Sequence, residues 1–221
     1  MAIADYLEEI AELERPLGIA KLVQLSGLEG GDIETLREVW PTIPEERRSE
    51  VVDALVQLGE DNVELNFDEV FRACLNDEDS RVRVKAIDGL WESEDKSFID
   101  AFIQLMRYDE EPDVRSTAAI ALGRFALMAE MDELKPANVE KVKGALLEKV
   151  NDDDESSDVR RRAVESVGFF SEDGVQDVVR RYYETGDEKM KASAVCAMGH
   201  SCDPTWLPVL IIELQNPDPE I

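Results

Sequence analysis

The sequence contains a single histidine, His200, among 221 residues. It therefore has neither the several His-Glu steps of an iron enzyme nor a convincing base for a Ser or Cys nucleophile. Cys196, His200 and Cys202 are close enough in sequence to suggest a metal site, but three candidates without a fourth ligand or a Cys-x-x-Cys pair favour ordinary helix-end residues. We expect no catalytic residues, no metal and no cofactor.

Cysteines and long apolar runs are also scarce. The three cysteines, Cys74, Cys196 and Cys202, are an odd number in a chain too long to need disulfides, which favours reduced thiols in the cytoplasm. There is no run of ~18 uncharged apolar residues and no basic start followed by an apolar segment, so we expect neither a membrane span nor a secretion signal.

Basic residues are few: 24 Lys and Arg stand against 51 Asp and Glu, for a formal net charge of -27. Phosphate contacts need clustered bases, so this balance argues against a nucleic-acid partner. Many acids precede predicted helices, as Asp152 to Asp154 do, where they cap N–H groups and keep the chain soluble. The alternative is an acidic rim that steers a basic partner.

What the chain does contain is a repeated pattern. Four stretches, which start at Val82, Val114, Val159 and Met190, each carry an apolar residue, then a base, an Ala four residues on, a small residue seven on and an apolar residue eight on. This spacing is one face of a helix, repeated. We expect the four alanines, Ala86, Ala118, Ala163 and Ala194, to be buried at equivalent places because small residues let helices approach closely.

Second, less uniform helices lie between these patterned helices, so the repeating unit is a helical hairpin: variable helix, acidic turn, patterned helix. We assign residues 1–65 to N-terminal helices with a degenerate capping repeat, in which Arg47 stands where the others have Val or Met, and 66–221 to the repeat array. Ile221 stands where another repeat would start. We therefore expect either a longer parent chain or an open C-terminal end that pairs with another molecule, self-association included.

The pattern resembles the HEAT-repeat superfamily, most closely the short HEAT-like repeats named after the phycobilisome lyases, over roughly residues 66 to 221. The resemblance implies an all-α, right-handed α-solenoid of about five stacked hairpins. It also implies pairs of Asp and Arg along the stack, for which Asp77 with Arg83, Asp109 with Arg115, and Asp154 with Arg160 match. Thr185 and Lys191 depart from the pattern in the next repeat.

The resemblance further implies that patterned helices line the concave side, where partners bind. Offsets of three, six and ten from the first apolar position fall on one stripe away from the alanines. The stripe consists of Lys85, Asp88, Glu92, Thr117, Ile120, Arg124, Arg162, Glu165, Phe169, Ser193, Cys196 and His200. Its mixed chemistry suits a protein or peptide. The alternative is a merely solvated face.

We therefore predict a non-enzymatic scaffold that binds a peptide or protein partner, with Ile120 and Phe169 as exposed apolar anchors. The alternative function, implied only by the name-giving relatives, is an accessory or lyase-like protein that handles a tetrapyrrole or modifies a partner protein. Trp91 stands where other repeats have Gly, and we expect it to pack between repeats.

Overall fold

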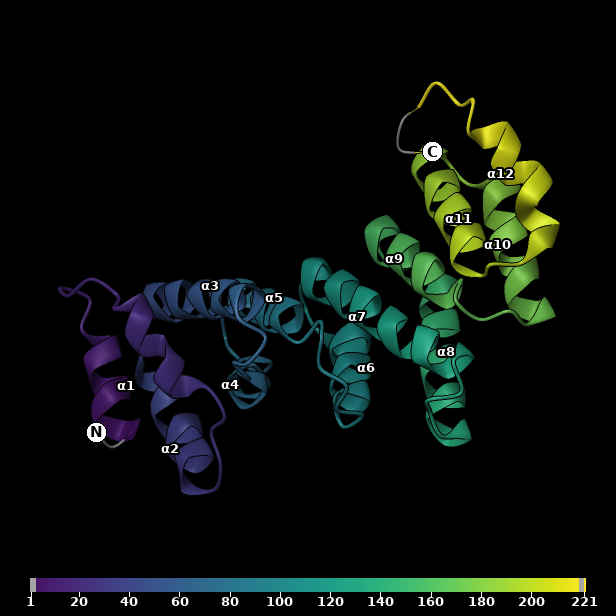
Figure 1. Ribbon diagram of the computed structural model, residues 1–221. Helices are drawn as coiled ribbons and strands as arrows, with labels where there is room; N and C mark the ends of the chain where they lie inside the picture. Colours follow the sequence, from purple (N-terminus) through teal and green to yellow (C-terminus); the bar gives the residue numbers. More distant parts are fainter. Residues whose placement is uncertain (1–2, 219–220) are drawn as a thin grey trace. The chain divides into compact units, whose positions relative to one another are not determined.

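The computed structural model describes residues 3–218 and 221, and the regular elements in these residues are all helical (Figure 1). The α-helices are α1 (Ile3–Ala11), α2 (Gly31–Val39), α3 (Glu45–Asp61), α4 (Asp68–Cys74), α5 (Ser80–Gly89), α6 (Phe98–Tyr108), α7 (Pro112–Glu130), α8 (Pro136–Val150), α9 (Ser157–Val167), α10 (Asp173–Thr185), α11 (Glu188–His200) and α12 (Leu207–Glu213). Three short 3-10 helices are η1 (Ile19–Leu25), η2 (Trp40–Thr42) and η3 (Pro204–Trp206). The predicted all-α class is confirmed.

The chain divides into two compact units, one ending at Asp95 and the other beginning at Lys96. This division falls later than the boundary between 65 and 66, which follows the register of the repeats. The reason is that α4 and α5 pack on α2 and α3, so the first array repeat belongs to the N-terminal unit. Tertiary packing and repeat register thus divide the chain at different places.

In the N-terminal unit, α3 packs beside α5 and α2 beside α4. Val51, Val52 and Leu55 of α3 are fully buried. Arg47 is also buried, because its Nη2 donates to the carbonyl oxygens of Glu12 (3.2 Å) and Arg15 (2.7 Å) just beyond α1. The degenerate repeat thus uses an arginine to bind the free carbonyl oxygens of the segment just beyond α1.

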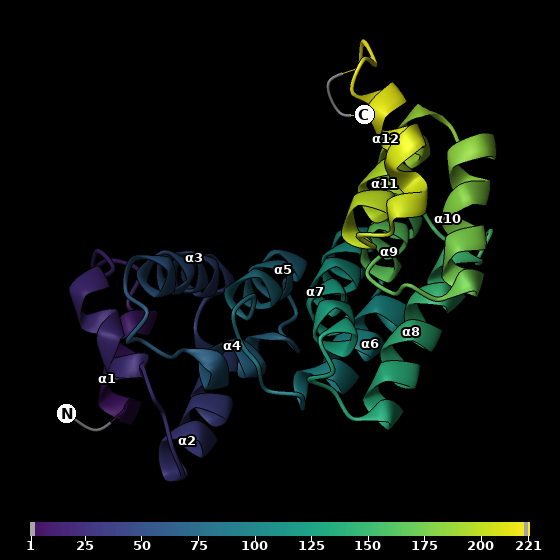
Figure 2. The same ribbon diagram turned by 45° about the vertical axis from the view of Figure 1, so that its right-hand side comes forward.

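In the second unit, α7, α9 and α11 form one layer and α6 and α8 pack behind it, with α10 against α11 (Figure 2). The four alanines of the pattern have no exposed surface, as predicted. The glycine at offset nine of one repeat contacts the small residue at offset seven of the next repeat, where both offsets are counted from the first apolar residue. A Cβ added to Gly123 would lie 2.7 Å from Ser166 Oγ, and one added to Gly168 would lie 2.5 Å from Ala197 Cβ. The pattern therefore encodes close contact between patterned helices.

The arginines of the predicted ladder bind differently from the expectation. Arg83 and Arg115 donate to the backbone oxygens of Asp77 (2.8 Å) and Asp109 (2.7 Å), and Arg160 pairs with Asp153 rather than Asp154. The carboxylate of Asp77 is held by Arg48 of the preceding repeat. Arg83 and Arg115 thus close their own turns through backbone carbonyls, whereas Arg160 binds a carboxylate of its own turn.

Links between repeats are made by carboxylates of the following turn. Arg115 of α7 and Lys149 of α8 converge on Glu155, with N–O distances of 2.8 and 2.7 Å, and the Glu155 side chain is 4% exposed. Burial alone would raise the pKa of this carboxyl. Hydrogen bonds from Arg115, Lys149 and the Ser156 N–H outweigh burial and lower the pKa to about 2. Glu155 therefore joins three helices as a carboxylate.

At the C-terminal end, α12 is held by a polar cluster around Glu213. Tyr183 Oη, Lys191 Nζ (2.8 Å) and Asn216 Nδ2 (2.6 Å) all donate to this carboxylate, which is 6% exposed. Outside the cluster the helix exposes Leu207, Ile211 and Ile212. The outer side of α12 is thus apolar, and its inner side is anchored by Tyr183 of α10 and Lys191 of α11.

No helix in the described part of the chain is both long and apolar enough to cross a membrane. The three cysteines are free thiols, with Cys74 buried and Cys196 and Cys202 exposed.

Candidate functional site

The structure brings together the six stripe residues that come from α9, the turn after it, and α11. Arg162 Nη1 pairs with Glu165 Oε2 at 2.7 Å, and Ser193 Oγ donates to Glu165 Oε1 at 2.6 Å. The two carboxylate oxygens of Glu165 are therefore used within the cluster. Because Glu165 carries one negative charge and Arg162 one positive charge, this part of the stripe is close to neutral in a strongly acidic chain.

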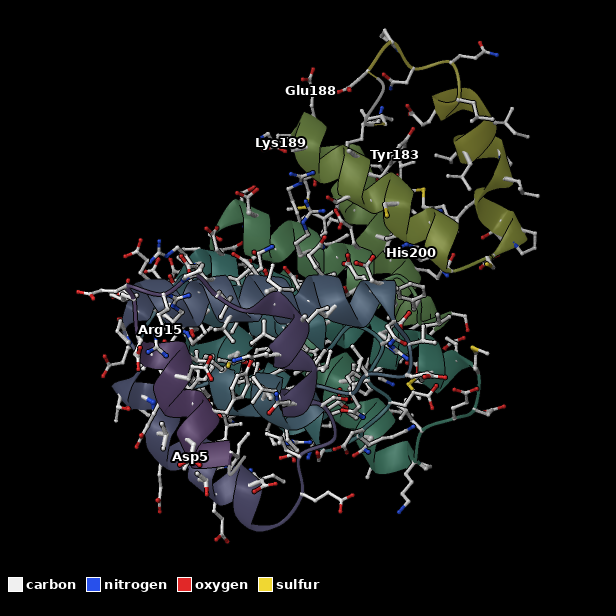
Figure 3. All side chains as sticks on the ribbon, turned by 60° about the vertical axis from the view of Figure 1, so that its left-hand side comes forward. Asp5, Arg15, Tyr183, Glu188, Lys189 and His200 are labelled. Atoms are coloured by element: carbon white, nitrogen blue, oxygen red, sulfur yellow. The ribbon has the colours of Figure 1, made fainter. Side chains whose placement is uncertain are left out.

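His200 connects this polar pair to an aromatic face. Its Nδ1 lies 2.9 Å from the backbone oxygen of Glu165, and its ring stacks on Phe169 with centroids 4.1 Å apart and planes 7° from parallel. A carbonyl oxygen only accepts, so Nδ1 carries the proton. Figure 3 labels His200 at the end of α11, opposite Glu188 and Lys189 at its start. We call the two stacked rings, which join the turn after α9 to the end of α11, the Phe169–His200 platform.

Cys196 borders the platform. Its Sγ lies 3.6 Å from Nε2 of His200, and the thiol is exposed. Burial of the sulfur and the nearby Glu165 carboxylate raise the pKa of the Cys196 thiol, while Arg162 lowers it. The raised pKa favours a protonated thiol, which donates to Nε2 of the imidazole. This arrangement orients the ring rather than activating the sulfur as a thiolate.

Two predictions for these helices need correction. Ser193 is 1% exposed, because Arg161 Nε donates to its hydroxyl at 3.0 Å and Glu165 accepts from it. The serine side chain is too short to extend past these neighbours, so it holds the Glu165 carboxylate from the buried side and does not face a partner. Phe169 is half-buried rather than fully exposed, since His200 covers one face of its ring.

The neighbouring helix α7 contributes the middle of the stripe. Ile120 is 49% exposed, as predicted for an apolar anchor, and Arg124 is half-buried. Thr117 is half-buried and its hydroxyl donates to the Asp113 carbonyl at 2.8 Å, which ties it to its own helix. Because α7 packs directly on α9, Ile120 and the Phe169–His200 platform belong to one layer of the same unit.

The remaining stripe residues, Lys85, Asp88 and Glu92, lie in the N-terminal unit and are exposed. Lys85 Nζ is 3.9 Å from carboxylate oxygens of both Asp53 and Asp88. Burial raises the pKa of Asp88; Lys85 lowers it and Glu60 raises it further. We therefore confine the candidate site to α7, α9 and α11.

Trp91, which we expected to pack between repeats, is 68% exposed. The helix α5 ends at Gly89, whereas α7 continues to Glu130. Trp91 therefore lies in a turn, whereas Gly123 and Gly199, at the same place in the repeat pattern, lie within helices. An early helix end was not visible in the repeat pattern.

Cys196 and His200 are in contact, but Cys202 Sγ lies against the Gly199 carbonyl at 3.7 Å. Across the residues that the structure describes, no group of three or more His, Cys, Asp or Glu side chains is arranged to hold a metal ion.

Comparison with known proteins identifies the repeats. Residues 68–153 match the family model for HEAT repeats. No curated protein matches the chain. Among solved structures, it is similar to a chain of the complex of CpcE and CpcF of phycocyanin lyase from Nostoc sp. PCC7120, with 22% identity and a TM-score of 0.52 over 76% of this chain and 98% of that chain. At this identity the likeness concerns the fold.

Residues 68–153 therefore carry HEAT repeats, and the helical fold is similar to that of a chain of the phycocyanin lyase complex, in agreement with the resemblance seen in the sequence pattern.

Proposed function

We propose that the chain is a non-enzymatic scaffold that binds a peptide or protein segment on the α7–α9–α11 layer. The observation that carries the proposal is the Phe169–His200 platform, an aromatic surface held in place by hydrogen bonds and placed in the same layer as the exposed Ile120. Rigid aromatic groups and nearby aliphatic anchors supply most of the binding energy at protein interfaces.

The charges around the platform favour selectivity over strong attraction. Arg162 and Glu165 pair with each other, so a partner meets a nearly neutral centre and not the acidity of the whole chain. Interface centres are typically depleted of uncompensated charge, while flanking charges set orientation. We expect an apolar partner side chain to cover the open face of the Phe169–His200 stack.

The proposal is tested by affinity capture from a lysate of the source cells with the wild type and with Phe169→Ala and Ile120→Ala variants. Both substitutions should reduce recovery of the same partner severalfold, while thermal unfolding changes little because Ile120 is exposed and Phe169 half-buried. The matched control is Leu127→Ala, since Leu127 is 42% exposed on α7 but outside the stripe. Equal losses in all three variants would refute the assignment of the surface.

A second candidate function is the handling of a tetrapyrrole together with a partner protein. The observation that favours it is the similarity to a chain of the phycocyanin lyase complex over 98% of that chain. An absorbance titration of the purified protein with an open-chain tetrapyrrole tests it. A saturable spectral change that Phe169→Ala weakens would support this function, and an unchanged spectrum would reject it.

A further inference from the structure

The N-terminal unit contains an apolar groove that the candidate site does not use. It lies between the segment that links α1 to η1 and one face of α3, and its volume is about 840 Å³. Leu13, Leu17 and Ile19 line one side, and Ala54 and Leu58 line the other. Leu13 is 49% and Ile19 55% exposed, so the groove leaves apolar surface in water. Burial of such surface favours an occupant.

The helix α3 forms the second wall because its two faces differ. Val51, Val52 and Leu55 are buried in the core of the unit, whereas Glu50, Ala54, Leu58 and Asp61 recur at three- and four-residue spacing on the groove side. A helix with this spacing presents a continuous stripe about three turns long. The groove is therefore long enough to accept several side chains in a row.

The rim of the groove is acidic. Glu50, Asp53 and Asp61 line it, and all three are exposed. The two arginines at its edge are already engaged: Arg47 donates to backbone carbonyls and to Glu50 Oε2 at 3.1 Å, and Arg15, labelled in Figure 3, pairs with Glu12 at 2.8 Å. Glu50 is thus paired with Arg47, and Asp53 lies 3.9 Å from Lys85 Nζ, so among the described residues Asp61 is the rim carboxylate without an ion pair.

We propose that this groove binds a basic amphipathic helix of another protein, with its apolar side chains between Ile19 and Leu58 and its lysines or arginines against the acidic rim. A helix lays apolar residues at three- and four-residue spacing into such grooves. Charge complementarity selects this occupant. A second copy of the chain would bring another net charge of -27, and a nucleic acid would be repelled by the same field.

The proposal concerns a surface in a different unit from the Phe169–His200 platform, so either can fail without the other. The test uses the full chain and fluorescence anisotropy with a labelled helical peptide of leucine and lysine, patterned so that the leucines occupy one face. Two control peptides have glutamate in place of lysine, or the same composition without the periodicity. We expect saturable binding of the patterned basic peptide alone.

Two pairs of variants locate the binding. The double variant Leu13→Ala/Ile19→Ala should weaken the peptide affinity about tenfold, whereas Ile211→Ala, at a similarly exposed position on α12, should not. Asp61→Lys should weaken binding and reduce its salt dependence, and Glu184→Lys, also in the last turn of a helix, should not. Absence of saturable binding, equal binding of the unpatterned peptide, or equal affinity of the double variant overturns the proposal.

Discussion

The packing of α9 against α11 leads to a sharp prediction for Gly168. This residue is buried, and a Cβ added there would lie 2.5 Å from Ala197 Cβ, 2.6 Å from its Cα and 2.8 Å from its backbone oxygen. Carbon atoms attract at about 3.5 to 4.0 Å, so the two helices must separate by about 1 Å at this point. Two of the three contacts are to backbone, which leaves no flexible side chain to move aside.

Gly168→Ala should therefore destabilise the protein by about 1 to 3 kcal/mol, the range observed when a methyl group is forced into a packed core. In a chain of this length, each kcal/mol lowers the melting temperature by about 2 to 4 °C. Circular dichroism during thermal and urea unfolding measures the change. The outcome is informative because alanine favours helical conformation more than glycine, so local propensity alone predicts the opposite sign.

Gly199 is the matched control, since it occupies the same position in the last patterned helix and a Cβ added there meets nothing within 4 Å. Gly199→Ala should be neutral or stabilise the chain by up to about 1 kcal/mol. If both variants melt at the wild-type temperature, the helices do not approach at Gly168 as the structure shows. If both are destabilised equally, the cost arises within the helices and not between them.

Three further outcomes are expected. Ala118→Leu overpacks a position with no exposed surface and should cost about 1 to 3 kcal/mol in urea unfolding; unchanged stability would contradict the repeat register. Tyr183→Phe removes a donor to Glu213 and should cost about 1 kcal/mol, with faster hydrogen exchange confined to α12. The folded pKa of Glu155 is about 2, below its ordinary value of 4.5, so its contribution is present above about pH 4.5 and is lost as the pH falls toward 2. Glu155→Gln should remove this part of the acid dependence of the melting temperature, whereas Asp153→Asn, in the same turn but 93% exposed, should leave it.

The repeat pattern predicts the fold because it records contacts that helices must make. Ala163 and Ala194 are buried since nothing larger fits where α9 and α11 approach, and that requirement is visible in the spacing. The pattern does not reveal how the length of a side chain and of its neighbours sets the exposure of a position. Lys85 at offset three is exposed and Ser193 at the same offset is buried, because Arg161 extends over the short hydroxyl.

Helix ends account for the other differences between expectation and structure. The helix α7 continues past Gly123 to Glu130. The end of α5 at Gly89 was not expected, and it turns Trp91 outward. The groove beside α3 was also missed, since its apolar wall comes from Leu13 in an irregular segment and Ile19 at the start of η1, neither of which belongs to a repeat. Its only sequence signal is that the exposed charges of α3 are all acidic.

The close contact at Gly168 and the platform at Phe169 are consequences of one local geometry. Gly168 meets Ala197, and Phe169, one residue after Gly168, stacks on His200, three residues after Ala197, with a 4.1 Å separation. The two rings can stack at this distance only if α9 and α11 approach each other as closely as Gly168 permits. A methyl group at Gly168 should therefore loosen the ring stack and the Ser193–Glu165 hydrogen bond as well as the core. Loss of partner capture in Gly168→Ala at a temperature where the variant remains folded would connect the repeat pattern directly to binding.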